Sequence, residues 1–342
     1  MSELIIVSEA KAPVWQVAED HFVTHTGEKV ITSSEKIGGG QKKNSPKQCF
    51  KATLMGEEVA LLISSNVAEG LDEIERTQRA QGKYVGIPPL LYGTFPIGEK
   101  EHLAQVQPLC TRPEDRLKGE DYPLMERVGH LIHLFKGLGE LKERKLTHCD
   151  LRLDNTLITP KGRLRIIDLE FLSEEQRLVN TTKTRGWKGD AAIVPPEIQV
   201  WNERSLEKDI NRMVHHLREP QSPQTDLFAA GLMAEKLIEG YTPTSSKEHF
   251  MLESLHAFVQ DVKGHWRTKS PEEGVKDLKA IRDGTYKPSE ESSSKEEIGA
   301  SGSQSRISNI LSTESGVTQY TDELPDEVSE EEYEKNPYIV YE

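Results

Sequence analysis

The chain has 342 residues, of which 35% are hydrophobic and 29% charged, a balance that predicts one large folded domain with polar additions. Its formal net charge of −14 argues against a nucleic-acid partner, because nucleic acids bind basic surfaces. The three cysteines are scattered, which disfavours a disulfide framework or a zinc site, and no apolar run reaches the roughly 18 residues of a membrane span. The first residues lack the pattern of a secretory signal, so we expect a cytoplasmic protein with reduced thiols.

Residues 1–36 form a lead-in with short apolar pieces, and the pattern leaves their position in the fold open. From residue 37 onward, short apolar runs alternate with glycine turns, which is typical of antiparallel strands. Two such runs cover 48–54 and 59–63, and they follow the glycine-rich segment 37–40. By itself, that glycine segment indicates only a flexible turn.

Helical and extended patterns then alternate along the chain. Residues 67–82 place apolar side chains on one side of a helix, and residues 102–110 favour a further strand. The segment 111–122 is polar and is expected to be irregular. The clearest helix is expected at 123–146, where apolar residues follow a three–four spacing and basic residues stand at the end.

The stretch that suggests chemistry follows this helix directly. It reads His-Cys-Asp-Leu-Arg-Leu-Asp-Asn from His148 to Asn155, and a second aspartate, Asp168, ends the next apolar run. Phosphoryl transfer needs one carboxylate that accepts the hydroxyl proton and oxygen ligands that hold Mg²⁺ on the phosphates. Asp150, Asn155 and Asp168 provide such a set, although an Asp–Asn pair taken alone is usually turn chemistry.

The rest of the chain changes character twice. Residues 198–222 are charged, look helical and are expected to form an insertion, and a helix is expected to begin near Asp226. Beyond about residue 286, apolar residues are too sparse to offset the entropy of ordering, so 287–342 is expected to be a disordered acidic tail. Its end carries tyrosines among glutamates, which suit either simple solubility or docking to a partner protein.

In order and spacing, these segments resemble the protein kinase family over about residues 37–285. The family pattern His-x-Asp-Leu-x-x-x-Asn is matched in full from His148 to Asn155. The match to the following Asp-Phe-Gly triplet is partial, because Leu and then Glu170 follow Asp168.

Two further landmarks come in family order, a Pro-Pro-Glu that ends at Glu197 and an Asp-x-x-x-x-Gly that begins at Asp226. The resemblance implies a two-lobed α+β fold, in which an antiparallel β-sheet with one helix precedes a mainly helical lobe. We expect the kinase-like domain at 37–286, with an N-terminal lobe at about 37–110 and a C-terminal lobe at about 111–286.

The resemblance also implies the roles of individual residues. Asp150 would accept the hydroxyl proton, and Arg152 would neutralise the transferred phosphate. Asn155 and Asp168 would hold Mg²⁺ or Mn²⁺, with ATP as co-substrate and a protein as acceptor. The implied nucleotide-binding residues are Gly38, Gly40, Lys47, Ala60, Glu75, Pro108 and Cys110. The implied structural residues are His148, Glu197 and Asp226, with Arg267 as the partner of Glu197.

The main departure from the family lies in the second of the two early strands. Leu62 stands where the family has the lysine that holds the α- and β-phosphates. The segment that begins at Lys47 resembles the with-no-lysine kinases, in which the preceding strand supplies this lysine. Lys47 therefore either takes that role or is a solvated loop charge. Glu75 then lacks its usual partner, and Glu73 is the alternative helix carboxylate.

Three functions are open for these residues. Retention of Asp150, Asn155 and Asp168 favours an active serine/threonine protein kinase. Leu62 and Glu170 favour a pseudokinase that acts as a scaffold or regulator, since Glu170 could either support or block metal binding. A small-molecule kinase shares the Asp–Asn pattern but usually lacks the Pro-Pro-Glu landmark, which counts against this third function.

Overall fold

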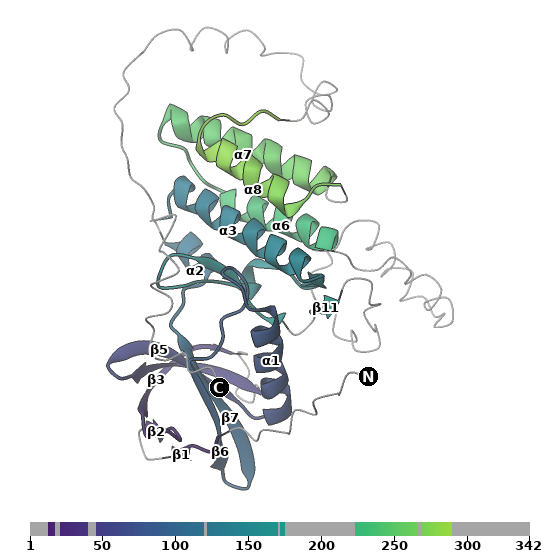
Figure 1. Cartoon of the computed structure of the whole chain (residues 1–342). Coiled ribbons are helices and arrows are strands. Elements are labelled where there is room, and N and C mark those ends of the chain that lie inside the picture. The colour runs from purple at the N-terminus through teal and green to yellow at the C-terminus, as the bar shows by residue number, and fades with distance from the viewer. Residues whose placement is uncertain are drawn as a thin grey trace, which may run out of the picture. The chain divides into compact units, whose positions relative to one another are not determined.

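The computed structural model describes residues 13–17, 21–39, 46–119, 122–169, 172–174, 223–265 and 268–288 (Figure 1). By its internal contacts the chain divides after Pro288, and all of the described residues lie in the first unit. The expected insertion at 198–222 and almost all of the expected disordered tail lie outside the described residues, so both stay predictions.

An antiparallel β-sheet forms the N-terminal part of the structure. Its seven strands follow the order β1-β2-β3-β4-β5-β7-β6. The strands are β1 (Gln16–Val17), β2 (His21–Val23), β3 (Lys29–Gly39), β4 (Lys47–Leu54), β5 (Glu57–Ser64), β6 (Leu91–Ile97) and β7 (Lys100–Pro108). Together with the helices that follow, this sheet confirms the expected α+β class.

The two ends of this sheet are joined, so that the sheet closes on itself. Val14 forms a parallel bridge with Thr94 of β6. The Trp15 amide donates to the Thr94 carbonyl at 2.7 Å, and the Thr94 amide donates to the Pro13 carbonyl at 2.8 Å. Closure satisfies backbone groups that would otherwise lie at open edges. The described residues between 13 and 36, which the pattern left without a position, therefore lie in or beside strands of this sheet.

Aromatic side chains fill the interior of the closed sheet. Trp15 is 1% exposed and packs near Phe22, whose ring meets Phe95 edge-on with centroids 4.7 Å apart. Gly93 leaves the space for Trp15, because a Cβ at this position would lie 2.1 Å from the indole Nε1. This tight fit holds the closing segment against β6.

A single described helix, α1 (Val67–Ala80), packs on the sheet at β7 (Figure 1). Gly70 allows a close approach, since a Cβ there would lie 2.4 Å from the Leu103 side chain. The surface of the sheet on which this helix lies is called the α1 face below. It is distinct from the surface that surrounds Trp15, because successive side chains of a strand point to opposite faces.

Helices make up most of the described chain beyond the sheet. They are α2 (Pro113–Lys118), α3 (Leu124–Glu143), α6 (Pro223–Ile238), α7 (Ser246–Gly264) and α8 (Pro271–Arg282), with the 3-10 turn η1 (Leu153–Asn155). Two small antiparallel sheets pair β8 (Leu146–Thr147) with β11 (Ser173–Glu174), and β9 (Thr156–Ile158) with β10 (Leu164–Ile166). The helix expected at 123–146 is present as α3. The segment 111–122, expected to be irregular, contains α2, because Pro113 is preset for a first helical turn.

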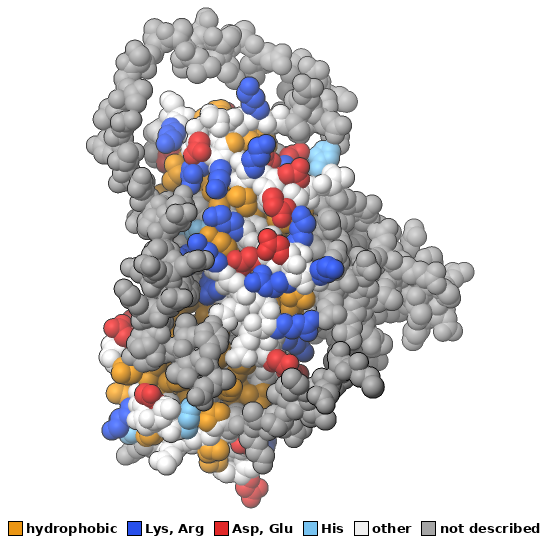
Figure 2. Space-filling model, in the orientation of Figure 1, with side chains coloured by type: hydrophobic (Ala, Val, Ile, Leu, Met, Phe, Trp, Pro, Cys, Tyr) orange, Lys and Arg blue, Asp and Glu red, His pale blue; other side chains and the backbone are white. Residues whose placement is uncertain are grey.

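The long helix α3 is in contact with α6, α8 and β10. Leu131, Leu134 and Phe135 on its apolar face are fully buried, which is the physical reason for their spacing in the sequence. On the face seen in Figure 2, basic and acidic side chains are mixed over the helices, and that view shows no large area of one sign. None of the described helices is long and apolar enough to cross a membrane.

The segment between α1 and β6 is fastened to the helical part. Glu140 of α3 accepts from the backbone amides of Lys83 and Tyr84 at 2.9 and 3.0 Å. Val85 forms a parallel bridge with Ile166 of β10. The sheet and α1 are therefore connected to the helical part through fixed backbone contacts as well as through the chain itself.

A buried polar chain fastens the turn between β9 and β10. The Tyr122 hydroxyl lies 2.6 Å from Nδ1 of His130, and Nε2 of His130 lies 3.1 Å from the Gly162 carbonyl oxygen. A carbonyl only accepts, so Nε2 carries the hydrogen and Nδ1 accepts from the Tyr122 hydroxyl. The imidazole is 2% exposed, and burial lowers the pKa of His130 to about 4.

Replacing Trp15 by alanine should destabilise the protein by about 3–5 kcal/mol, because it empties the interior of the closed sheet. Urea denaturation followed by far-ultraviolet circular dichroism measures this change. Val14→Ala is the matched control, since Val14 is the neighbouring residue and is 65% exposed. A Trp15→Ala variant as stable as Val14→Ala would contradict the closure of the sheet by this segment.

Lowering the pH from 7 to 5 should weaken the fold through His130. Below its ordinary pKa of about 6.5, this histidine takes up a proton in the unfolded chain but stays neutral in the folded one, whose pKa is about 4. Stability is therefore lost as the pH falls, by roughly 2 kcal/mol at pH 5 from this group. Urea denaturation at both pH values should show a smaller loss for His130→Gln than for the wild type. The exposed His256→Gln should behave like the wild type; parallel losses in all three proteins would refute the assignment.

Candidate active site

The segment from His148 to Asn155 is anchored by a carboxylate on α6. Asp226 is 3% exposed and lies in the first turn of that helix. Its Oδ2 accepts from the His148 amide at 2.7 Å and its Oδ1 from the Cys149 amide at 3.1 Å. Burial raises the pKa of Asp226, whereas the two amide donors favour the ionised form. Both oxygens accept a backbone hydrogen, so the carboxylate fixes the direction in which the loop leaves β8.

The His148 side chain joins this loop to the strand segment that carries Asp168. Its Nε2 lies 2.9 Å from the Ile167 carbonyl oxygen, and its Nδ1 accepts from the Asp150 amide at 3.3 Å. The carbonyl can only accept, so Nε2 carries the hydrogen. The imidazole therefore has one orientation, and it sets the distance between the segments of Asp150 and Asp168.

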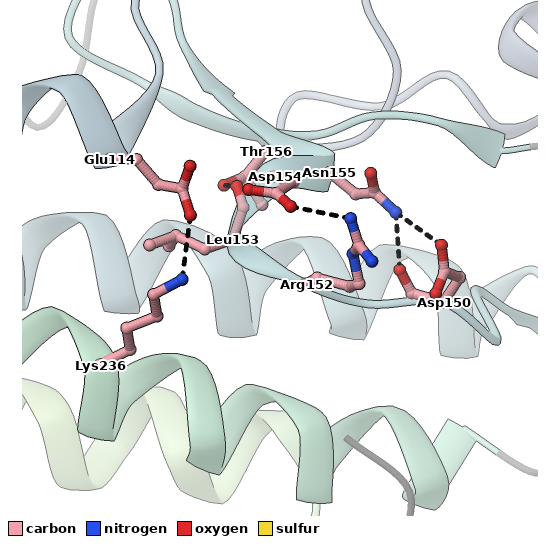
Figure 3. A network of polar contacts seen from close by, with 8 residues as sticks. All are labelled: Glu114, Asp150, Arg152, Leu153, Asp154, Asn155, Thr156 and Lys236. Carbon is pink, nitrogen blue, oxygen red and sulfur yellow. Dashed lines mark hydrogen bonds and ion pairs between the residues drawn. The ribbon is translucent and has the colours of Figure 1, made fainter. Parts of the chain in front are cut away.

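Asn155 orients the carboxylate of Asp150. Its Nδ2 donates both to the Asp150 backbone carbonyl at 2.8 Å and to Oδ2 of the same residue at 2.9 Å (Figure 3). Asn155 is itself buried, and its backbone carbonyl accepts from the Ile167 amide at 2.9 Å. Because Nδ2 faces Asp150, the side-chain oxygen of Asn155 points away from it, as Figure 3 shows.

The carboxyl group of Asp150 is half-buried, and its protonation is tuned by its neighbours. Burial raises the pKa of Asp150, and the negative charge of Asp168 adds to this effect. The charge of Arg152 and the bond from Asn155 oppose it. A carboxylate with a raised pKa is a better proton acceptor than a free aspartate, which is the property that a general base needs.

Asp168 is exposed and has a left-handed backbone with φ of 60°, and Cys149 has a φ of 68°. Non-glycine residues seldom adopt this conformation, which costs on the order of 1–3 kcal/mol where it is forced. The bonds from Asp226 and His148 to the backbone of these segments offset that cost. Two strained residues thus lie in the same small region as Asp150 and Asn155.

Two side-chain oxygen donors of this region are of the kind that Mg²⁺ binds. Mg²⁺ binds through one or two protein oxygens together with water and substrate phosphates. The side-chain oxygen of Asn155 and the exposed carboxylate of Asp168 are donors of that kind. Within the described ranges there is no group of three or more His, Cys, Asp or Glu that could hold a metal ion.

Arg152 is paired within the loop itself. Its Nη2 lies 2.7 Å from Oδ2 of Asp154, and its buried Nε has no hydrogen-bond partner among the described residues. A second ion pair lies alongside, in which Lys236 of α6 contacts Glu114 of α2 at 2.9 Å (Figure 3). The contact of Arg152 with a transferred phosphate stays a prediction, and such a contact would compete with Asp154.

The strand pairing places the predicted nucleotide residues in rows on the α1 face. Residues directly opposite one another on neighbouring strands share a face. One row joins Cys49 to Leu62, and the next joins Lys47 to Ser64, so Lys47 lies on the same face as Leu62. The buried Ala60 belongs to the same face, one row further along β5.

The carboxylate that meets Lys47 comes from Glu73, with Nζ at 2.5 and 2.7 Å from its two oxygens. Glu73 is the alternative helix carboxylate of the sequence analysis, whereas Glu75 is exposed and its role stays a prediction. Two residues along a helix turn the side chain by about 200°, so these two glutamates lie on nearly opposite sides of α1. Sequence spacing could not decide between Glu73 and Glu75, because the choice depends on how α1 packs on the sheet and thus on which side of the helix faces β4.

The remaining predicted residues lie at the edges of this face or beyond the described ranges. Gly38 is opposite Cys49 near the end of β3, and Pro108 ends β7. Cys110 is half-buried, and burial raises the pKa of its thiol to about 11. Outside the described residues lie Gly40, Glu170, Glu197, Arg267 and the insertion.

Two residues of this region were not singled out from the sequence. Asp154 pairs with Arg152, and its short spacing from Arg152 was the signal that could have identified it. Arg112 reaches β3 from the start of α2, a contact between residues far apart in the sequence. No local pattern indicates such a contact.

Comparison with known proteins gives a partial match. No family model matches the chain. A stretch of 104 residues is 27% identical to the serine/threonine-protein kinase stk11 of Xenopus laevis and equally to STK11 of Gallus gallus. The match covers 29% of this chain and 24% of each relative, so the chain spans about a quarter of the length of the curated relatives it matches. This limited similarity indicates a protein kinase-like relationship, with which the α+β fold is compatible.

Replacing Asp226 by alanine should destabilise the protein by about 3 kcal/mol, because a buried and a partly buried backbone amide lose their acceptor. Urea denaturation measures the loss, and amide hydrogen exchange at His148 and Cys149 should accelerate. Glu235→Ala on the same helix is the control, since it removes only a partly exposed ion pair with Lys263. Unchanged exchange at both amides would show that Asp226 does not anchor the loop.

Proposed function

We propose that the chain is an atypical protein kinase that transfers the γ-phosphoryl group of ATP to a serine or threonine hydroxyl of a protein substrate. The observation that carries this proposal is the bond from Asn155 to Asp150. It fixes the carboxylate beside Asp168 and leaves the side-chain oxygen of Asn155 directed elsewhere. One base and two separate oxygen donors are the minimum set for this reaction.

In this reaction Asp150 accepts the proton of the acceptor hydroxyl while the hydroxyl oxygen forms a bond to the γ-phosphorus. The bond from that phosphorus to the bridging oxygen breaks, and ADP leaves with the electron pair. Asn155 and Asp168 would hold Mg²⁺, which neutralises charge on the phosphate oxygens when bound. The raised pKa of Asp150 supports its role as the proton acceptor.

Lys47 is proposed to supply the positive charge that Leu62 does not. Its ammonium group lies on the α1 face, one row from Leu62 along β5, and Glu73 holds it there. Both side chains are partly exposed, at 39% and 29%, so the pair is accessible to a ligand. This arrangement supports the relocated-lysine interpretation over that of a solvated loop charge.

We further propose that the closed sheet with α1 corresponds to the N-terminal lobe of a kinase and the helical part to the C-terminal lobe. We also propose that the chain acts on a protein substrate and that its acidic tail binds a partner protein. A pseudokinase is the second candidate. It is supported by Leu62 on the α1 face and by the engagement of Arg152 with Asp154, which leaves that guanidinium partly occupied.

The test combines nucleotide binding with phosphoryl transfer. ATP should raise the melting temperature of the wild type in the presence of Mg²⁺ or Mn²⁺, since a ligand of the folded state stabilises it. Asp150→Asn should keep this rise but reduce transfer of labelled phosphate by about 100-fold or more. Lys47→Ala should weaken ATP binding by about tenfold, a loss of about 1.4 kcal/mol.

The control for Lys47 is Lys100→Ala, at the exposed first residue of β7. Equal effects of Lys47→Ala and Lys100→Ala would exclude the relocated lysine. Loss of ATP binding in Asp150→Asn would assign that residue a structural role. A wild type that binds ATP with metal but transfers no phosphate would favour the pseudokinase.

A further inference from the structure

The side chain of Arg112 lies against the end of β3. A Cβ built on Gly38 would be 3.1 Å from Nη2 of Arg112 and 3.4 Å from Cβ of Cys49. Gly38 and Cys49 are opposite each other, so the guanidinium lies on the α1 face of the sheet. The guanidinium therefore lies beside the row of residues that runs from Gly38 through Cys49 to Leu62 of β5.

The backbone of Arg112 belongs to the other side of the candidate site. The preceding Thr111 exchanges two hydrogen bonds with Ile158 of β9, at 2.9 and 2.8 Å. This bridge fixes the start of α2 to the small sheet that follows Asn155. Arg112 therefore extends from the segment next to the loop of Asp150 to the glycine segment of β3.

The charge of Arg112 is not neutralised by the described residues. The two lysines on the same face of β4 are paired, Lys47 with Glu73 and Lys51 with Glu58. Arg112 is exposed, and within the described part of the chain its guanidinium has neither a hydrogen bond nor an ion pair, whereas its backbone carbonyl accepts from the first turn of α2. Burial raises the pKa of the Cys49 thiol, and the positive charges of Lys47 and Arg112 oppose this effect, so both charges act close to the thiol.

We propose that Arg112 binds phosphate oxygens of the nucleotide, an inference that rests on the proposed function and adds a residue to its binding site. A guanidinium presents a planar fork of donors that matches a phosphate group, and it remains charged at all relevant pH values. Gly38 allows this fork to approach β3 closely. The row that contains Leu62 then receives a second positive charge, from the start of α2, in addition to that of Lys47 one row away.

The test measures affinities of the full-length chain for Mg·ATP, Mg·ADP and adenosine by isothermal titration calorimetry. Arg112→Gln should weaken ATP binding at least tenfold and leave adenosine binding within twofold. Arg112→Lys should restore part of the loss, since it keeps the charge but not the fork. Lys118→Gln is the matched control, because this exposed lysine ends the short helix that Arg112 precedes and forms an ion pair with Asp115.

The outcomes separate this inference from the proposed function. Unchanged ATP affinity in Arg112→Gln would overturn the inference alone. Equal losses for ATP and adenosine would also overturn it, because they would place the side chain against the nucleoside. A wild type that binds neither ATP nor ADP would overturn both proposals. A wild type that binds ATP without transferring phosphate would overturn the catalytic proposal. If Arg112→Gln still weakens ATP binding in that case, the inference about Arg112 stands.

Discussion

The buried carboxylate of Asp226 is the contact on which the arrangement of the candidate active site depends. It accepts from two consecutive amides, and so it sets both the position and the direction of the loop that begins at His148. The histidine then bonds to the Ile167 carbonyl, and Asn155 bonds to Asp150. Base and oxygen donors are therefore positioned from one helix, α6, although neither group lies on it. Such indirect support is what holds strained backbone in place.

The second constraint is the closure of the sheet by the residues around Trp15. A closed sheet has no free edge at which its strands could shift, so the rows of side chains on the α1 face keep their register. The close packing of Gly70 on Leu103 places α1 against these rows. The ion pair between Lys47 and Glu73 follows from this packing rather than creating it, since a partly exposed pair contributes little stability of its own.

Charge is largely balanced inside the candidate site. Arg152 meets Asp154, Lys236 meets Glu114, and the lysines of β4 meet glutamates. An anionic ligand must compete with these internal carboxylates, and such competition depends on salt because the groups are only partly buried. Among the basic residues that the structure describes on the α1 face, Arg112 is the exception, because its guanidinium has no carboxylate partner there. An unpaired guanidinium can bind a phosphate without first breaking an internal ion pair, which makes its exposed position chemically significant.

Local patterns in the sequence were enough to predict α3, the strands β4 and β5, and the loop from His148 to Asn155. Each depends on the periodicity or spacing of neighbouring residues, which the chain carries in itself. Only the tertiary structure decided which side of α1 meets β4, that Trp15 closes the sheet, and that Arg112 reaches Gly38. These contacts join residues far apart in the sequence, and they depend on how elements pack. Packing is set by shape and burial across the whole domain, which no local pattern records.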